Sequence, residues 1–452
     1  MISRLTLLLP ILLPLAVILL PFGKLVEVPL GLLFLAGIVL LWRLPKSEDV
    51  PWSTLAGLWA AFTLPMLLAL PDAVALEKSL LTTVGTLRFG LSCAAMLALF
   101  SLAAAPAEFQ RRTLHGFGLV VALCLLLWCA DALLQFVTGR NILGYGLGEG
   151  YVNGLFGDDD NIKLGATVAL LLPVALVHGL RHWPLLPTLA MLLLILAVIV
   201  LSGKRAAWVM AAVELALVAL YYMVRGRLGL LRAMLFGLAA LAVAALAFSY
   251  SDWVRERSTI IVEAVESPDY DTLNRATGIR LPIWGTALRI GRDHWVNGVG
   301  PRGFRYVYTD YASADDVWAR PLPNAPGAKA SHAHQLILEL WCETGVIGIG
   351  GYLAMLFLLL RSWQRADEAA RSRALPFAAT LGAMLFPVNT HPAWYSSWSS
   401  LLLWMFIGLY LFALCAEKTK VAHTKQRSAG SADTVLGSTA GHVSAAGAAP
   451  LR

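Results

Sequence analysis

The stretch SHAHQLILELWCETGVIGIGGYL, residues 331–353, begins with polar side chains and passes into an apolar run that continues to about residue 360. About 20 apolar residues in a helix cross the hydrocarbon core of a bilayer. We therefore predict a membrane span over residues 334–360. His332, His334 and Glu339 lie at its polar entrance, where ionisable side chains are costly and usually functional.

The rest of the chain has the same apolar character. Of its 452 residues, 58% are hydrophobic and only 14% are charged, more apolar surface than a soluble protein of this length could bury. In lipid a segment must satisfy its own backbone hydrogen bonds, which at this hydrophobicity means a helix. The predicted fold class is an all-α polytopic membrane protein.

Twelve apolar segments are candidate transmembrane helices. They are residues 5–21, 28–42, 52–70, 80–104, 114–137, 163–180, 184–202, 206–224, 229–249, 334–360, 374–390 and 398–416. The first contains two prolines and has no small-residue cleavage site, so we expect a retained span and not a cleaved signal peptide. The five cysteines fall in or beside these runs without any CxxC spacing, which favours packing over disulfides.

Lysine and arginine set the predicted orientation, because cytoplasmic loops are enriched in both. If the N-terminus is cytoplasmic, the inner loops carry Arg43, Lys46, Arg111, Arg112, Arg181, Arg225, Arg227, Arg232, Arg361, Arg365, Arg371, Arg373, Lys418 and Lys420. The outer loops carry fewer, namely Lys24, Lys78, Arg140, Lys163, Lys204 and Arg205. This bias predicts an inner-membrane protein with both termini in the cytoplasm. It also assigns the net charge of +7 to topology and not to nucleic-acid binding.

Four regions follow from this topology. Residues 1–249 hold transmembrane helices 1–9, residues 250–333 form one large periplasmic loop, residues 334–416 hold helices 10–12, and residues 417–452 form a disordered cytoplasmic tail rich in Ala, Gly, Ser and Thr. A loop as long as 250–333 is usually functional. Its stretch TGIRLPIWGTALRIGRDHW places Ile279, Ile283, Ala287 and Ile290 at helical spacing, which predicts an amphipathic helix on the outer surface.

Several cations are candidate anion ligands on the predicted periplasmic side. Lys204 and Arg205 begin a span there, against the positive-inside bias. They either extend to lipid phosphates or bind an anionic substrate, for which the arginine offers a bidentate fork. In the loop we single out Arg280 and Arg302, while a solvated charge remains the simpler interpretation of Arg289 and Arg305. Arg88, inside the fourth span, is a buried cation that contacts either a lipid phosphate or a carboxylate.

The histidines at the entrance of the 334–360 span are candidate bases. Ser331 would cap a helix whose first turn holds His332 and His334, and a helix N-terminus disfavours protonation of a nearby histidine. A neutral imidazole there can take a proton from an attacking hydroxyl, although the same histidines could simply satisfy local hydrogen bonds. A metal site at these histidines, or at Asp158, Asp159 and Asp160, is the other interpretation; we expect no required metal, because both histidines on one helix would point apart.

Three stretches resemble the O-antigen ligase and polymerase family of bacterial envelope enzymes. They are LSGKRAAWV, RLPIWGTALRI followed by NGVGPRGFRYVY, and SHAHQLILELWCETGVIGIGGY. The family shows an Arg that opens a span, a loop Arg ahead of a Trp, a GxG turn with an aromatic tail, and an H-x-H-N-x-x-L-E…E-T-G-x-x-G stretch. The order of the motifs and the topology of the whole chain both fit. One departure is Gln335, where the family commonly has Asn.

The resemblance implies a metal-independent glycosyltransferase without a cofactor, facing the periplasm with a GT-C-like arrangement of helices. The donor would be a glycan on undecaprenyl pyrophosphate, and the acceptor a sugar hydroxyl of lipid A-core. Arg205 and Arg280 would bind the pyrophosphate, helped by Lys204, Arg302 and Arg88. His334 would be the general base, with His332 orienting or substituting for it. Glu339 matches the glutamate of the motif and would belong to the substrate site.

The ligase is the branch of the family that these features favour. Two other branches remain open, namely a polymerase that extends O-antigen on its carrier and an enzyme that glycosylates pilin-like proteins. A transporter of a lipid-linked anion is the alternative from another class, since it would use the same arginines for binding only. Such a transporter should show mid-membrane charges and an internal repeat, and neither is evident in the sequence.

Overall fold

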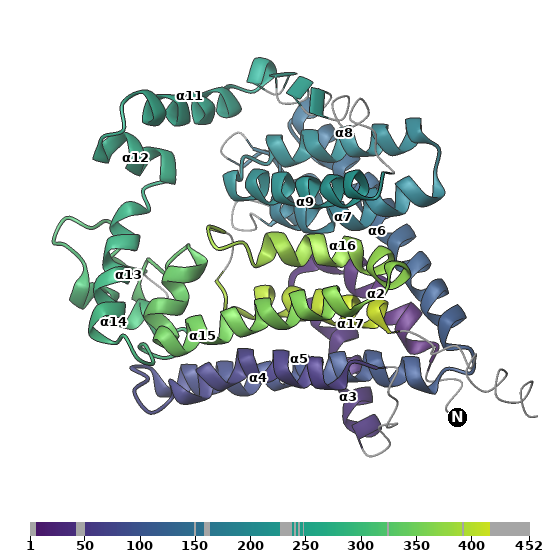
Figure 1. The fold of residues 1–452 in the computed structure, drawn as a ribbon. Helices are drawn as coiled ribbons and strands as arrows, with labels where there is room; N and C mark the ends of the chain where they lie inside the picture. Colours follow the sequence, from purple (N-terminus) through teal and green to yellow (C-terminus); the bar gives the residue numbers. More distant parts are fainter. Residues whose placement is uncertain are drawn as a thin grey trace, which may run out of the picture. The chain divides into compact units, whose positions relative to one another are not determined.

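The computed structural model describes the chain from Thr6 to Cys415 apart from residues 42–49, 149–150, 158–162, 227–236, 239–240, 243–244, 247, 323–324 and 391–392. Helices dominate the described residues (Figure 1). The first half contains α2 (Leu8–Ile18), η1 (Leu20–Val26), α3 (Glu27–Leu41), α4 (Trp52–Leu68), α5 (Leu76–Leu102), α6 (Pro106–Thr138), η2 (Gly154–Phe156), α7 (Leu164–His182), α8 (Leu185–Leu201) and α9 (Arg205–Val224).

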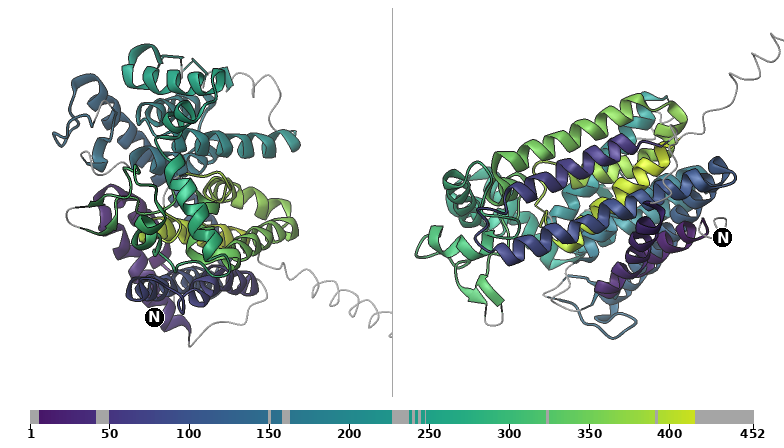
Figure 2. Two further views of the ribbon diagram at one scale, coloured as in Figure 1. Left: turned by 90° about the vertical axis from the view of Figure 1, so that its left-hand side faces the viewer. Right: turned by 90° about the horizontal axis from the view of Figure 1, so that it is seen from below.

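The second half begins with shorter elements and ends with long helices. These are α11 (Asp252–Glu266), α12 (Tyr270–Thr277), α13 (Leu281–Asp293), α14 (Phe304–Tyr311), the antiparallel pair β1 (Pro321–Leu322) and β2 (Ala325–Ala328), α15 (Leu336–Arg365), α16 (Glu368–Met384) and α17 (Ser397–Leu414). The long helices α4, α5, α15 and α17 run alongside one another (Figure 2).

Seven of the described helices are long and apolar enough to cross a membrane. Three further apolar helices, α2, α4 and α8, are shorter. The predicted all-α membrane fold is confirmed at this level. The predicted segments coincide with helices except for 229–249, which lies largely outside the described residues, so the number twelve stays a prediction. All five cysteines are free, and all but Cys124 are buried.

Helix α15 is broken near its beginning, at Gly345, whose φ is 59°. The backbone groups freed by the break pair with the turn after α13. Val346 N donates to Trp295 O at 2.9 Å, and Val299 N donates to Cys342 O at 2.9 Å. A Cβ on Gly345 would lie 2.4 Å from the Val296 backbone, so only glycine allows this approach. The break thereby fastens the segment between α13 and α14 to the beginning of α15.

The amphipathic helix of the 250–333 segment exists, but one detail of the prediction is wrong. Ile279 lies outside α13, with a φ of 61°, and the helix begins at Leu281 with Pro282 in its first turn. The apolar face, formed by Ile283, Ala287 and Ile290, packs in a cluster with α14 and the first turns of α15. A second apolar core therefore orders this segment at the beginning of α15 (Figure 1).

Candidate active site

The two histidines of the opening motif lie in the coil that leads into α15. Their ring centroids are 3.7 Å apart with the planes tilted by 42°. The expected cap at Ser331 is wrong, because the N-cap is Gln335, whose side-chain oxygen accepts from Leu338 N at 2.6 Å. The expectation that the rings point apart on a helix is wrong for the same reason. The Gln335 amide nitrogen donates to Pro387 O at 2.7 Å, so both ends of the amide are used.

His334 is held as a neutral base. Burial, reinforced by the nearby positive charge of Arg280, lowers the pKa of its imidazole from 6.5 to about 3. His332, its neighbour, has Nδ1 2.9 Å from Ser331 Oγ. A neutral imidazole at this position can accept a proton from a hydroxyl that approaches it.

Arg280 reaches this place from the N-cap position of α13. Its Nη1 lies 3.5 Å from Thr390 O, in the connection between α16 and α17, and burial lowers the pKa of the guanidinium. The preceding residue, Ile279, is fixed by Trp318, whose Nε1 donates to Ile279 O at 2.6 Å. Trp318 thus holds the backbone next to Arg280, and Arg280 lies near the histidine coil.

Arg205 approaches the same region from the first residue of α9. Its guanidinium donates to the carbonyls of Ala276 and, at 3.5 Å, Arg275, which end α12. The free carbonyls at a helix C-terminus attract cations. A Cβ on Gly278 would lie 2.8 Å from Arg205 Nη2, so the glycine leaves room for this arginine.

We call Arg205, Arg257 and Arg280 the arginine cluster, because Arg257 and Arg280 both lie near enough to Arg205 to repel it. Within the described part of the chain, none of the three forms an ion pair with a carboxylate. Three cations gathered without a counter-ion make a site for an anion. The sequence analysis did not single out Arg257, because the stretch WVRERST around it carries no motif. Arg257 belongs to the cluster only through the position of α11 in the fold.

A second cationic group lies in a cleft of about 330 Å³. Its cations are Lys78, Arg88 and Arg302, and its hydroxyl groups belong to Thr82, Thr86, Tyr395, Ser396, Ser397 and Ser400. We call it the cationic cleft. Arg88 Nη1 also contacts Glu27 at 3.2 Å, the carboxylate pairing that was one of its two predicted roles.

Two buried glutamates on α15 accept hydrogen bonds from the backbone of residues that line the cleft. Glu343 is fully buried and accepts from Arg302 N at 2.8 Å. Glu339 is 1% exposed and accepts from the backbone amides of Trp394 and Tyr395. Glu339, predicted for the substrate site, therefore lies under the wall of the cleft. Unlike the arginines of the cluster, Arg88 of the cationic cleft has a carboxylate partner among the described residues, namely Glu27.

The remaining candidates fall elsewhere. Lys204 is the N-cap residue of α9, and its ammonium lies 4.6 Å from the centroid of the Tyr151 ring. Asp158, Asp159 and Asp160 lie outside the described residues. The predicted set is therefore divided, with Arg205, Arg280 and His334 in one place and Arg88 and Arg302 in the other.

Residues with a strained backbone lie at or next to both the arginine cluster and the cationic cleft. Among the described residues, the non-glycine residues with positive φ are Ile279 (61°), Arg302 (65°) and His334 (51°). Positive φ is uncommon outside glycine, and most costly for a β-branched residue such as Ile279. Strained residues persist where the surrounding structure holds them, and they cluster at functional sites. All three adjoin or belong to the cationic groups.

An apolar groove begins at Arg205. Its first part, about 180 Å³, is lined by α9 as far as Val213 and by the end of α16 with Asn389 and Thr390. A larger part, about 550 Å³, continues along α9 from Leu217 to Val224, against α15 and α16, and shares Phe386 with the first. The groove runs for most of the length of α9.

A known protein family matches part of the chain. The model of the O-antigen ligase family matches residues 190–353, which include α9, the segment from α11 to β2 and the beginning of α15 with both histidines. No curated protein matches the chain. Through residues 190–353, which hold the whole arginine cluster and His334, the chain is similar to the O-antigen ligase family.

Proposed function

We propose that the chain is an O-antigen ligase of the bacterial inner membrane. It transfers a glycan from undecaprenyl pyrophosphate to a sugar hydroxyl of lipid A-core on the periplasmic side. The observation that carries this proposal is a half-buried, neutral His334 beside Arg280. Arg280 belongs to the arginine cluster, which has no ion-pair partner among the described residues, and Arg205 of that cluster lines an apolar groove. Neither a transporter nor a simple anion-binding protein requires a neutral base at that position.

The transfer is a single displacement. The acceptor hydroxyl oxygen forms a bond to the anomeric carbon while the bond from that carbon to the diphosphate oxygen breaks. His334 takes the hydroxyl proton, and the released undecaprenyl diphosphate keeps the electron pair. Arg205 and Arg280 stabilise the negative charge that grows on the leaving group, which is the main electrostatic task of the reaction. Attack from the opposite face inverts the anomeric centre.

The groove along α9 suits the donor lipid. A polyprenyl chain needs an apolar surface at the level of the bilayer, and its diphosphate must lie at the membrane edge. Arg205 is at one end of the groove, and the walls beyond it are almost entirely apolar. The diphosphate would lie against Arg205 and Arg280 with the polyprenyl chain between α9 and α16.

The cationic cleft suits the second substrate. Arg302 N donates to Glu343, which lies seven residues and roughly 10 Å along α15 from Leu336, the first residue after the histidine coil and its cap. A second anionic group, such as a phosphate of the lipid acceptor, would bind Lys78, Arg88 and Arg302 while its sugar reaches His334. Lys204 would assist at the outer edge of the donor site. Two lipid substrates would thus be held by two separate cationic groups.

The activity is tested with the full-length protein in detergent or liposomes, carrier-linked glycan and lipid A-core. The expected product is lipid A-core with the mass of the added glycan, formed by the wild type and by His294→Ala but not by His334→Ala. His294 is a matched control, since it is a histidine of the same 250–333 segment. A longer glycan that stays on the carrier would make the chain a polymerase, and carrier movement without any new bond would make it a transporter.

The orientation is tested separately. Single cysteines placed between Tyr250 and Ser331 should react with a membrane-impermeant thiol reagent in cells whose inner membrane is intact. The expected result follows from the arginines of the loops on either side. Labelling that appears only after this membrane is broken would refute the periplasmic site and the proposed mechanism together.

A further inference from the structure

Three histidines meet where two helices of the bundle end. His115 belongs to α6, while His178 and His182 lie four residues apart on α7 and so share a face. One ligand nitrogen from each can be chosen so that all lie within 4.8 Å of one another. The ring centroids are 5.2, 4.6 and 4.8 Å apart, so each ring adjoins the other two.

The spacing matches a tetrahedral metal site. Zinc binds histidine nitrogen at about 2.0–2.1 Å, which places two such ligands about 3.4 Å apart in a tetrahedron. His115 Nδ1 and His182 Nε2 are 3.4 Å apart. Two imidazoles already have the separation of ligands to one ion, and a nitrogen of the third lies within 4.8 Å of a nitrogen of each.

The third histidine has an unpartnered nitrogen. His178 is 6% exposed, and its buried Nε2 has no hydrogen-bond partner. A buried polar atom without a partner is costly, and a metal ion is one ligand that would satisfy it. The ring is also accommodated by the facing helix, because a Cβ on Gly118 would lie 2.7 Å from His178 Nδ1. The packing of α6 leaves room for this imidazole where any larger residue would displace it.

We propose that His115, His178 and His182 bind a divalent transition-metal ion, with zinc as the best fit. Three imidazoles and one water give the four-coordinate arrangement that zinc prefers, whereas magnesium and calcium prefer oxygen ligands. The metal fastens α6 to α7 at this end of the bundle. It is a structural clamp between the two helices.

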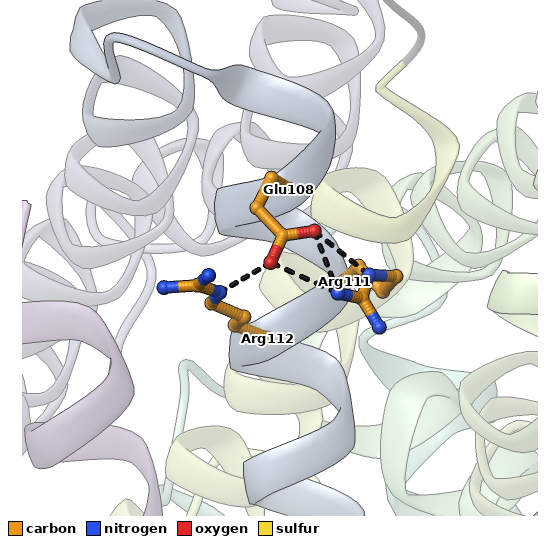
Figure 3. Close-up of polar contacts among 3 residues, drawn as sticks. All are labelled: Glu108, Arg111 and Arg112. Carbon is orange, nitrogen blue, oxygen red and sulfur yellow. Dashed lines mark hydrogen bonds and ion pairs between the residues drawn. The ribbon is translucent and has the colours of Figure 1, made fainter.

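Two charged side chains near the three histidines, Glu108 and Arg181, form hydrogen bonds with other residues. Glu108, one to two turns before His115 on α6, accepts from both Arg111 and Arg112 (Figure 3), so this carboxylate is already neutralised. Arg181 lies near enough to His178 and His182 to repel a positive charge there, while its Nη2 donates to Ser372 O and, at 3.2 Å, to Ser372 Oγ.

The clamp is separate from the transfer chemistry. The other end of α7 lies beside the beginning of α9, because a Cβ on Gly165 would lie 2.0 Å from Ser202 Oγ. Helix α7 has 19 residues and is therefore about 28 Å long. The histidines lie at the end that the predicted orientation assigns to the cytoplasm. The proposal does not depend on the proposed ligase function, and its test needs no substrate.

The test uses full-length protein purified through a tag without histidines and stripped of metal. Titration with zinc should show one equivalent bound, and cobalt should give the absorption of a tetrahedral site. His178→Ala should weaken zinc binding by at least about 100-fold, since even outer partners of metal ligands contribute 10- to 100-fold. Zinc should raise the melting temperature of the wild type and of the control His294→Ala, but not that of His178→Ala.

Because His178 is buried, its replacement could prevent folding. The exposed ligands His115 and His182 supply the second variants, His115→Asn and His182→Gln, which should fold and each lose the same zinc response. Undiminished zinc binding in both, or no saturable binding by the wild type, would overturn the proposal and leave the three rings as a packing contact.

Discussion

The arginine cluster and the cationic cleft contain the same kinds of side chain but differ in what surrounds them. Arg302 of the cleft is bound to buried Glu343 through its backbone, and Arg88 pairs with Glu27. Arg205 and Arg280 of the cluster donate to backbone carbonyls, Arg280 also lies near the neutral His334, and Arg257 lies 4.8 Å from the centroid of the Trp253 ring. A compensated arginine can hold an anion in place, whereas an uncompensated one gains much more when negative charge develops. From this comparison we propose that the cluster takes part in the chemistry and that the cleft takes part in binding.

The largest effect should come from the base. His334→Ala should reduce turnover by about 10² to 10⁴, the usual cost of losing a general base, while the protein still inserts and binds the carrier. His332→Ala should be milder. Product formation is measured at matched membrane abundance for both variants. Near-normal turnover by His334→Ala would remove this residue as base, and loss confined to His332→Ala would move the role two residues upstream.

Arg280→Ala should lower turnover by about 10², which is typical of losing one preorganised donor to developing charge. Arg280→Lys should not restore it fully, because lysine lacks the bidentate fork. The steady-state constants for the donor are measured with saturating acceptor. Complete rescue by lysine would mean that only net charge matters, which would make the cluster resemble the cleft.

The cleft should behave differently. Lys78→Ala and Arg88→Ala should each raise the KM for the acceptor by about tenfold, the worth of one charge-assisted hydrogen bond, with kcat little changed. Lys78 is exposed and serves as the variant with least effect on folding. A loss that falls on kcat and on donor use instead would place the diphosphate in the cleft and reverse the two assignments.

The pH dependence distinguishes free from occupied enzyme. With the pKa of His334 near 3, kcat/KM should not fall between pH 7 and pH 5 through protonation of this base. A bound diphosphate near the ring favours the imidazolium, so the acidic limb of kcat should lie at higher pH. His334 binds a proton near pH 6.5 in the unfolded chain but only near pH 3 in the folded chain. The unfolded state is therefore favoured as the pH falls through that interval, and the free energy of unfolding decreases. A kcat/KM limb near 6.5 would contradict the buried environment.

The smallest expected effect is that of chelation. Positive side chains supply the charge that a metal would otherwise bring, so initial turnover should survive EDTA. Removal of zinc from the histidines of α6 and α7 would lower the melting temperature and leave the initial rate unchanged. A rate that vanishes with EDTA and returns with Mg²⁺ or Mn²⁺ would instead favour a site at Asp158, Asp159 and Asp160.

The sequence by itself predicted most of the helices and the residues that are candidates for the chemistry. Long apolar runs predicted the membrane helices because a helix in lipid depends on its own residues, and the prediction of α13 from its spacing succeeded for the same reason. The Arg205, Arg280 and His334 positions were found because each stands at a boundary between polar and apolar sequence. That boundary is a local property.

Only the tertiary structure decided which of these residues meet. Arg257 joins the cluster, Arg88 and Arg302 line a separate cleft, and Gln335 replaces Ser331 as the cap. The break at Gly345 lets the turn after α13 pair with the backbone of α15. The three histidines of α6 and α7 come together in the same way, through packing of a glycine against a ring. Contacts between distant segments depend on how helix faces interlock, and the periodicity of a single helix does not contain that information.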